Sequence, residues 1–179
     1  RDGSDESGCQ LLVIGEGYKK DVAPISSVCE PDCTLVPVKV HISISLLKIV
    51  SMEEVQHKID LQFGIILEWN ELRAKYLNLK NKASLNALTQ DEIGLLWLPY
   101  VVYANTDMKE AVQLTNEVKT TIVITKEGKR RNTKWFDVDE TEIYDGIDNK
   151  MAMHQTYTKS FQCQYHLQKY PFDTQVSYN

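Results

Sequence analysis

Residues 59–69 have the sequence Ile-Asp-Leu-Gln-Phe-Gly-Ile-Ile-Leu-Glu-Trp, and every odd-numbered position in this stretch holds an apolar side chain. Successive side chains of a β-strand point to opposite faces, so a period of two predicts a strand that buries one face. This is the clearest strand pattern in the chain. The fold class follows from it and from similar patterns on both sides of it.

A second strand is predicted over residues 38–50. Apolar and polar side chains alternate there as far as Leu46, which predicts a half-buried strand. Beyond that point the phase changes, because Leu47 and Ile49 form the next apolar pair. A bulge or an edge crossing would produce such a change. The alternating residues are Val38, Val40, Ile42 and Ile44 on one face, and Lys39, His41, Ser43 and Ser45 on the other.

The remaining sequence adds further strand patterns and one helical pattern. Residues 120–125 are rich in β-branched side chains and are followed by Glu127-Gly128, which predicts a strand and a turn. Residues 151–161 predict another strand, and the polar residues 77–93 predict a loop with a short helical turn. Residues 4–17 predict a short N-terminal helix that ends at Gly15 and Gly17. The spacing is typical of an all-β sandwich with one N-terminal helix.

The composition is that of a globular protein. The chain has 179 residues, of which 42% are hydrophobic and 25% charged, and this length suffices for one substantial core. The net charge of -5 argues against a nucleic-acid partner, because phosphate binding needs a clustered basic face. The densest basic group, at residues 126–131, is more simply explained as a hairpin tip. No stretch of the sequence contains the run of about 20 apolar residues that a membrane-spanning helix needs.

The cysteines and histidines do not form a recognisable metal or catalytic pattern. The four cysteines are Cys9, Cys29, Cys33 and Cys163, and they allow three complete pairings, among which the sequence does not choose. A turn at Pro31-Asp32 would let Cys29 and Cys33 close locally. Cys163 and His166 are three apart on an expected strand and would point to opposite faces. We therefore expect no enzymatic activity and no cofactor.

An acidic stretch over residues 137–148 offers ligands for a metal ion. It contains Asp137, Asp139, Glu140, Asp145 and Asp148, whose carboxylates are the ligands that calcium prefers. The spacing does not match a calcium-binding EF-hand loop. A solvated acidic loop is the simpler interpretation, and no metal site is predicted.

Three motifs resemble those of one known family. Residues 163–177 contain Cys163 and the group Tyr170-Pro-Phe-Asp-Thr-Gln175, and this stretch resembles the signature loop of the Cys-loop receptors, the pentameric ligand-gated ion channels. The segment Trp69-Asn-Glu-Leu-Arg73 and the segment Trp97-Leu-Pro99 resemble two further family motifs in the same order. The second cysteine of the family's loop is replaced by Ser177. Cys163 then lacks its family partner, and a free thiol, a pair with Cys9 and an introduced change all stay open.

The resemblance is greatest to nicotinic-type subunits and implies the architecture and setting of the protein. Residues 1–179 would form the N-terminal part of an extracellular ligand-binding domain, an immunoglobulin-like β-sandwich that continues into later strands and membrane helices. Five identical or related subunits would surround a pore, on the extracellular face of the plasma membrane. A small neurotransmitter-like ligand would bind between subunits and gate a channel, expected to conduct cations.

The resemblance also implies a set of ligand-binding residues. An aromatic box between subunits would hold a cationic ligand by cation–π attraction, and Trp69 would supply one wall from the complementary subunit; its alternative role is to complete the apolar stripe of its strand. The principal subunit would supply a tyrosine where this chain has Ala104, so Tyr103 and Tyr100 are the candidates. Trp97 is expected in the core. Further complementary contacts are expected from Ile122, Ile124 or Arg131.

The signature loop would transmit binding to the pore. Pro171 and Phe172 would form an apolar wedge and Asp173 an interfacial acid, and the loop that carries Glu53 and Glu54 would lie beside them. Two other functions stay open: a soluble binding protein of the acetylcholine-binding kind, and a β-sandwich assembly module that binds no ligand. Measuring the number of subunits in the assembly and the binding of amine ligands would discriminate between these functions.

Overall fold

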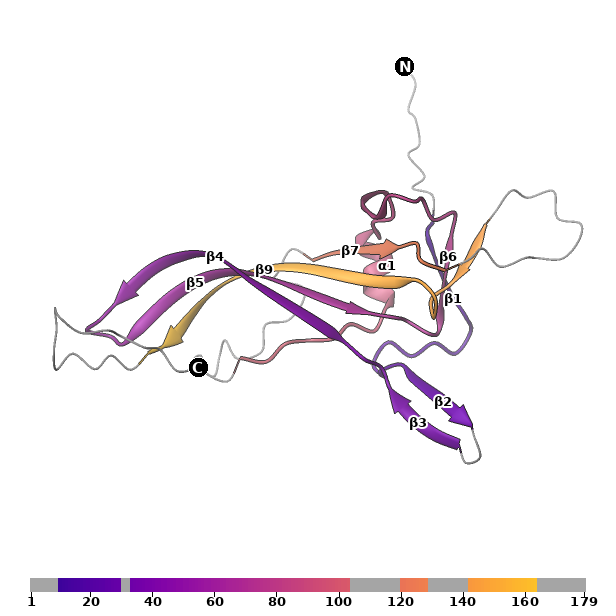
Figure 1. The fold of residues 1–179 in the computed structure, drawn as a ribbon, viewed down its shortest axis with the longest axis horizontal. Helices are drawn as coiled ribbons and strands as arrows, with labels where there is room; N and C mark the ends of the chain where they lie inside the picture. Colours follow the sequence, from indigo (N-terminus) through magenta and orange to yellow (C-terminus); the bar gives the residue numbers. More distant parts are fainter. Residues whose placement is uncertain (1–9, 30–32, 104–119, 129–141, 164–179) are drawn as a thin grey trace, which may run out of the picture. The chain divides into compact units, whose positions relative to one another are not determined.

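The structure is a computed structural model that describes residues 10–29, 33–103, 120–128 and 142–163. It divides into two compact units. Figure 1 shows the helices and strands of the described residues. Unit 1 comprises residues 1–41, 68–98 and 121–153, and unit 2 comprises residues 42–67, 99–120 and 154–179. The long strands β5 (Lys58–Trp69) and β9 (Lys150–Gln162) each begin in one unit and end in the other. The expected all-β class is confirmed, since strands dominate the described residues.

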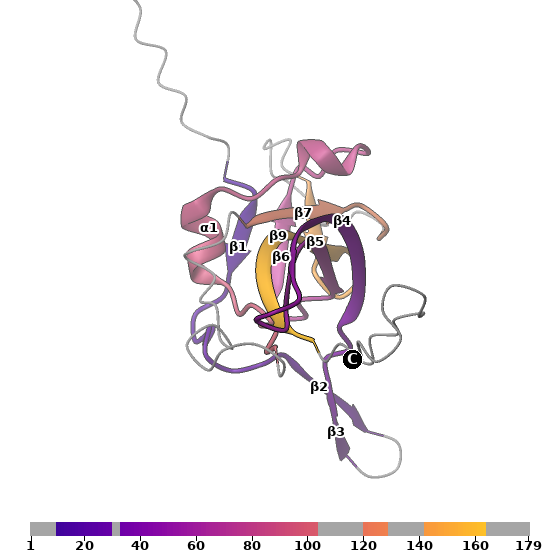
Figure 2. The same ribbon diagram turned by 90° about the vertical axis from the view of Figure 1, so that its left-hand side faces the viewer.

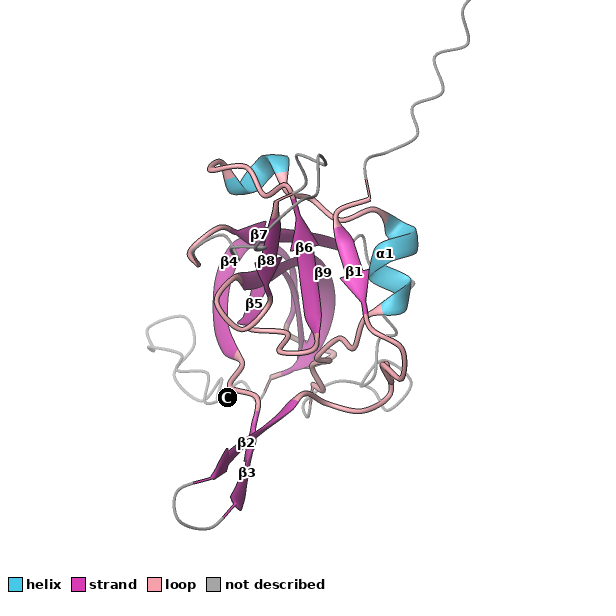
Figure 3. Cartoon of the chain, turned by 90° about the vertical axis from the view of Figure 1, so that its right-hand side faces the viewer, coloured by secondary structure: helices cyan, strands magenta, loops and turns pink. Residues whose placement is uncertain are grey.

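Unit 1 contains a three-stranded antiparallel sheet with the order β1-β6-β8, formed by Leu12–Ile14, Ala74–Leu77 and Ile143–Asp145 (Figure 3). Leu12 is paired with Tyr76, which is paired with Tyr144. These three side chains are at most 2% exposed, so they form one cross-strand row of the core.

The helix α1 (Gln90–Leu95) is joined to β1 by one carboxylate. Thr89 and Glu92 form a capping box, in which each side chain accepts a hydrogen bond from the other's backbone N–H. The carboxylate of Glu92 also accepts hydrogen bonds of 2.8 Å from the backbone N–H groups of Leu11 and Leu12. Glu92 therefore caps its own helix and holds the first strand of unit 1.

A separate antiparallel hairpin is formed by β2 (Ile25–Cys29) and β3 (Cys33–Pro37) (Figure 2). Its register places Cys29 opposite Cys33. The turn expected at Pro31-Asp32 lies outside the described residues. Local closure between the two cysteines agrees with this register and stays a prediction.

A four-stranded sheet has the order β4-β5-β9-β7, with β4 at His41–Glu53 and β7 at Thr121–Thr125. The strands predicted around residues 59–69, 120–125 and 151–161 are thus confirmed as β5, β7 and β9. Along β5 the buried side chains are Phe63, Ile65, Leu67 and Trp69, which is the predicted alternation.

Two expectations about local structure are wrong. The helix predicted over residues 4–17 is contradicted where it is described, because Leu12–Ile14 form a strand paired with β6 and Tyr18 follows a turn; residues 4–9 lie outside the described residues. The strand predicted as half-buried over residues 38–50 is present as β4, but nearly all its residues are exposed, including Ile44 at 64%. Within the described residues, no other strand covers its outer edge.

Candidate functional site

An aromatic cluster in unit 2 surrounds Tyr103, one of the predicted ligand residues. Phe63 comes from β5, and Tyr157 and Phe161 come from β9, four residues apart and therefore on one face of the strand. The ring centroid of Tyr103 lies 5.8 Å from that of Phe63, 5.7 Å from that of Tyr157 and 6.2 Å from that of Phe161, and the interplanar angles are 69°, 67° and 71°. These edge-to-face arrangements are the favourable ones for aromatic pairs.

A lysine of the chain itself lies against this cluster. The ammonium group of Lys159 is 5.6 Å from the centroid of the Tyr103 ring, within cation–π range, and Lys159 is 4% exposed. Lys159 shares its face of β9 with Tyr157 and Phe161, since the three residues are two apart. The ring of Tyr103 is thus already in contact with a protein cation. Phe63, Tyr157 and Lys159 are buried, whereas Tyr103 and Phe161 keep some accessible surface.

Hydrogen bonds fix the polar ends of the same cluster. The hydroxyl of Tyr157 donates to Oε1 of Gln155 at 2.7 Å, and Nε2 of Gln155 donates to Oγ1 of Thr120 at 2.9 Å. Burial raises the pKa of Tyr157, and burial together with the neighbouring Tyr157 raises the pKa of Tyr103. Both phenols therefore stay neutral at physiological pH. They therefore supply no negative charge to this cluster.

Three of the predicted ligand residues are sealed inside the protein. Trp69 is 1% exposed and packs edge-to-face on Trp97, with ring centroids 6.2 Å apart. Ile124 is fully buried, as is Ile122. Side chains without accessible surface do not form the wall of a site between subunits, so the ligand contacts expected of Trp69, Ile122 and Ile124 are contradicted. Trp69 instead completes the apolar stripe of β5, the alternative considered for it.

Tyr100 differs from these residues because its side chain is 72% exposed. It follows Pro99 in the segment that leads to Tyr103, so one short segment supplies a solvent-facing phenol and a phenol packed in the core. Tyr100 and Tyr103 are both in unit 2. Arg131 and Ala104 lie outside the described residues, and the contacts expected there stay predictions.

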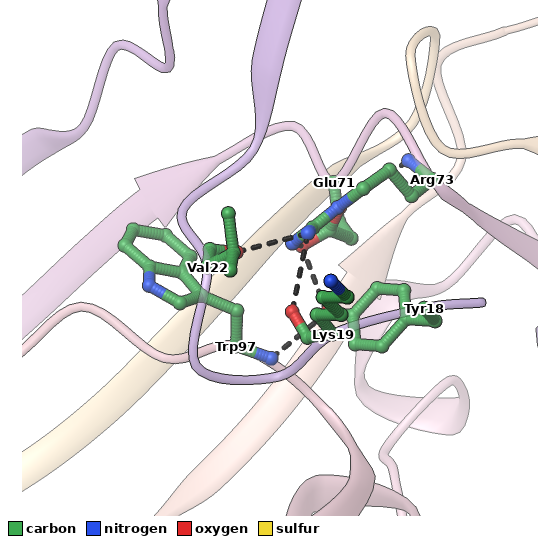
Figure 4. Close-up of polar contacts among 6 residues, drawn as sticks. All are labelled: Tyr18, Lys19, Val22, Glu71, Arg73 and Trp97. Carbon is green, nitrogen blue, oxygen red and sulfur yellow. Dashed lines mark hydrogen bonds and ion pairs between the residues drawn. The ribbon is translucent and has the colours of Figure 1, made fainter.

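The motif that includes Trp69 proves to have a structural role that the sequence analysis did not identify (Figure 4). Glu71 is fully buried and receives hydrogen bonds from Nε of Arg73 at 2.8 Å and from its Nη2 at 3.0 Å. Nη1 of Arg73 donates to the carbonyl oxygens of Lys19 and Val22. The guanidinium carbon also lies 4.4 Å from the centroid of the Tyr18 ring. This ion pair, whose carboxylate is buried, thereby fastens residues 18–22 to the end of β5.

Tyr18 extends this network to the Trp97 segment. Its hydroxyl donates to Glu71 at 3.1 Å and accepts a hydrogen bond of 2.8 Å from the backbone N–H of Trp97. Burial, together with the nearby negative charge of Glu71, raises the pKa of Tyr18 to about 12. The signal in the sequence was the combination of Glu71 and Arg73 two residues apart after a buried strand. This spacing indicates an ion pair, but it does not reveal that Tyr18, Lys19 and Val22 are the partners of that pair.

The loop expected to lie beside the signature loop is the turn between β4 and β5. Glu53 ends β4, Glu54 begins the turn, and both side chains are exposed. His57 closes the turn with a φ of 53°, and its carbonyl oxygen accepts a hydrogen bond of 2.7 Å from the backbone N–H of Cys163. Cys163 is a free thiol. The signature-loop residues Pro171, Phe172 and Asp173 lie outside the described residues.

The described part of the chain contains no group of three or more His, Cys, Asp or Glu residues that could hold a metal ion. Asp145 and Asp148 of the acidic stretch are described, whereas Asp137, Asp139 and Glu140 are not. The calcium alternative is therefore untested. None of the helices within the described ranges is long and apolar enough to span a bilayer.

Comparison with known proteins identifies the family. A search of curated proteins found no match. The family model for the neurotransmitter-gated ion-channel ligand binding domain matches residues 10–177. This match covers nearly the whole chain and includes all three motifs described above. The chain therefore belongs to the family of neurotransmitter-gated ion-channel ligand-binding domains.

Proposed function

We propose that this chain is the ligand-binding part of a pentameric channel subunit, that it binds a small neurotransmitter-like ligand at subunit interfaces, and that binding gates a cation pore. The observation that carries the proposal is the family match over residues 10–177. The order of the Trp69, Trp97 and Cys163 motifs supports it. The domain would lie on the extracellular face of the plasma membrane.

Tyr100 is the proposed ligand contact among the described residues. Its ring is exposed, and it precedes by three residues the Tyr103 ring that is packed against Phe63. An anchored segment that carries an exposed phenol can present it to a neighbouring subunit without rearranging the core. Tyr103 then has two proposed roles: it holds this segment, and the partly exposed edge of its ring borders the ligand. Arg131 remains a proposed complementary contact.

Cationic amines are the ligand class that fits an exposed aromatic ring. A cation over an aromatic face gains about 0.5–1 kcal/mol at an exposed site, which corresponds to about a 2- to 5-fold change in affinity. We expect calorimetric titration with choline and a panel of primary and quaternary amines to show saturable binding. Tyr100→Ser should weaken the binding of the best amine by about that factor.

Val102→Ser is the matched control, because Val102 is also exposed and lies in the same segment. It should leave the affinity unchanged. The proposal fails if the folded wild-type protein binds none of the amines. The assignment to Tyr100 fails if both variants bind as tightly as the wild type.

The contact between His57 and Cys163 supports a route from the ligand domain to the pore. Through this hydrogen bond, the turn that carries Glu54 is attached to the first residue of the signature loop. We propose that movement of the turn between β4 and β5 is transmitted to the signature loop through this hydrogen bond. The residues proposed to pass it on to the pore are Glu53, Glu54, Pro171, Phe172 and Asp173. Proline keeps the carbonyl oxygen but cannot adopt the φ of 53° that His57 has, so His57→Pro should move this oxygen away from Cys163. In a channel assembled from full-length subunits, it should therefore weaken gating, measured as current per bound agonist, while agonist affinity persists.

A ring of five subunits is part of the proposal. The mass of the purified assembly, measured by light scattering, should correspond to five copies of the subunit. A stable monomer at concentrations above those used for ligand titration would contradict it.

A further inference from the structure

The hairpin formed by β2 and β3 has one cysteine on each strand, at the end of the strand nearest the turn (Figure 2). The antiparallel register ends at the tip with Cys29 opposite Cys33. At the base, the backbone N–H of Val38 donates a hydrogen bond of 3.2 Å to the carbonyl oxygen of Pro24. The backbone therefore places the two cysteines directly across from each other.

This position satisfies the distance requirement of a disulfide. Residues opposite each other in an antiparallel ladder have Cα atoms about 4.5 or 5.5 Å apart, depending on the hydrogen-bonding pattern. Disulfides join residues whose Cα atoms are about 4.4–6.8 Å apart, so both kinds of pair are within range. The loop from Cys29 to Cys33 is also short, so bringing its ends together costs little chain entropy.

The register also chooses among the cysteines. Cys163 is a free thiol of unit 2, whereas β2 and β3 belong to unit 1. Cys9 lies outside the described residues. Among the cysteines that the structure describes, Cys29 and Cys33 are the two that the backbone sets opposite each other. The sequence alone left this choice open.

The other residues of the hairpin specify its register weakly. The pairs next to the tip and the base set Ser26 opposite Val36 and Ser27 opposite Leu35, so polar side chains lie across from apolar ones. Neither strand alternates here, and register is strongly specified only where one face of a strand is consistently apolar. A covalent bond at the tip would exclude every register in which the two cysteines are not opposite.

We propose that Cys29 and Cys33 are a thiol–disulfide site, at which oxidation forms a cross-strand disulfide that locks the register of the β2–β3 hairpin. The oxidant is a small disulfide such as glutathione disulfide. One cysteine thiolate attacks it and releases one glutathione thiol, and the second cysteine then attacks the mixed disulfide and releases the other. The two cysteines together lose two protons and two electrons, which the two glutathione molecules take up. Outside the cell, such a bond persists.

Peptide mapping tests the pairing without any ligand, so its outcome does not depend on the proposed function. The purified protein is equilibrated with reduced and oxidised glutathione, its remaining thiols are alkylated during denaturation, and it is digested with trypsin. Trypsin cleaves after Lys20 and Lys39, so the peptide of residues 21–39 contains Cys29 and Cys33 and no other cysteine. This peptide should be unalkylated and lighter than its reduced form by the mass of two hydrogen atoms.

Two variants separate this site from the other thiols. Cys163→Ser is the matched control and should leave the disulfide of peptide 21–39 intact. Cys33→Ser should leave Cys29 alkylated or joined to glutathione. The pairing is overturned if both cysteines of the wild-type peptide are alkylated after oxidation, or if either is joined to any other cysteine of the protein.

Hydrogen exchange tests the effect of the bond on the hairpin. In the Cys163→Ser protein, reduction should speed the exchange of the backbone amides of β2 and β3. The double variant Cys29→Ser/Cys33→Ser should exchange at the reduced rate whether or not a reductant is present. If the disulfide forms but reduction leaves these rates unchanged, the bond does not lock the register and that part of the inference is overturned.

Discussion

β4 and β5 are adjacent strands with nearly the same length and the same kind of alternation, yet their burial is opposite. Ile65 on β5 is 1% exposed, whereas Ile44 on β4 is 64% exposed. Both patterns correctly place apolar side chains on one face. The alternation in the sequence determines which side chains share a face of the strand. Whether that face is covered depends on segments distant in sequence, such as Tyr103 and β9, which pack against β5.

The largest expected effect comes from removing the biggest buried side chain of β5. Trp69→Ala should lower the free energy of unfolding by about 3–5 kcal/mol, because it leaves a cavity against Trp97. The matched substitution on β4, Leu46→Ala, should change it by less than about 0.5 kcal/mol. Urea denaturation of both variants checks this. Equal losses would show that the face of β4 is covered in solution.

A second test concerns the packing beyond the end of β5. A Cβ atom added at Gly146 would collide with the carbonyl oxygen of Glu71 and lie 2.8 Å from that of Ala74. Gly146→Ala should therefore destabilise the protein by about 1–3 kcal/mol. Gly15→Ala is the control, because nothing lies within 4 Å of its added Cβ. A neutral result at Gly146 would mean that the turn after β8 does not pack as described.

The next prediction concerns the buried carboxylate of Glu92. Burial alone raises its pKa, but hydrogen bonds from the backbone N–H groups of Thr89, Leu12 and Leu11 outweigh burial and hold the pKa below its usual value. The stabilisation is therefore present above the unfolded pKa and is lost as pH falls through the folded pKa. Glu92→Gln should cost about 1–2 kcal/mol at pH 7.

The difference between wild type and Glu92→Gln should shrink as the pH is lowered through this range. Urea titrations at several pH values between neutral and acidic conditions measure it. A difference that is constant with pH would show that the charge of Glu92 is not what holds β1 to α1.

The smallest effect is expected on the polar face shared by β4, β5 and β9. The carboxylate of Asp60 on β5 accepts hydrogen bonds from the hydroxyls of Ser51 on β4 and Ser160 on β9. These hydrogen bonds lower the pKa of Asp60, so their contribution is also lost as pH falls through the folded pKa. On acidification, the melting temperature of Asp60→Asn should fall slightly less than that of the wild type. Thermal melts at neutral and acidic pH check this, and a large loss at neutral pH would contradict it.

Local pattern was sufficient to predict β5, β7 and β9, because each has enough alternating or β-branched residues to specify a strand by itself. It was insufficient at Leu12–Ile14, where an apparent helical stripe forms a strand because β6 supplies its hydrogen-bond partners. It was also insufficient for the exposure of β4, because no local feature shows whether another layer covers the face of a strand.

The candidate site was harder to predict than the fold. The apolar period of β5 was compatible with Trp69 in the core or at an interface, and the contact with Trp97 decides for the core. Lys159 and Tyr103 are 56 positions apart in the chain, so their contact depends on tertiary structure. The order of the three motifs, by contrast, was visible in the sequence and led to the family.

The most direct test of the central claim, that the ligand meets Tyr100 and not Trp69, is a pair of calorimetric titrations with the best amine. The claim predicts that Tyr100→Ser lowers the affinity, whereas Trp69→Phe, which keeps an aromatic ring in the core, leaves the affinity at the wild-type value. The opposite result, loss of affinity in Trp69→Phe with no change in Tyr100→Ser, would contradict it.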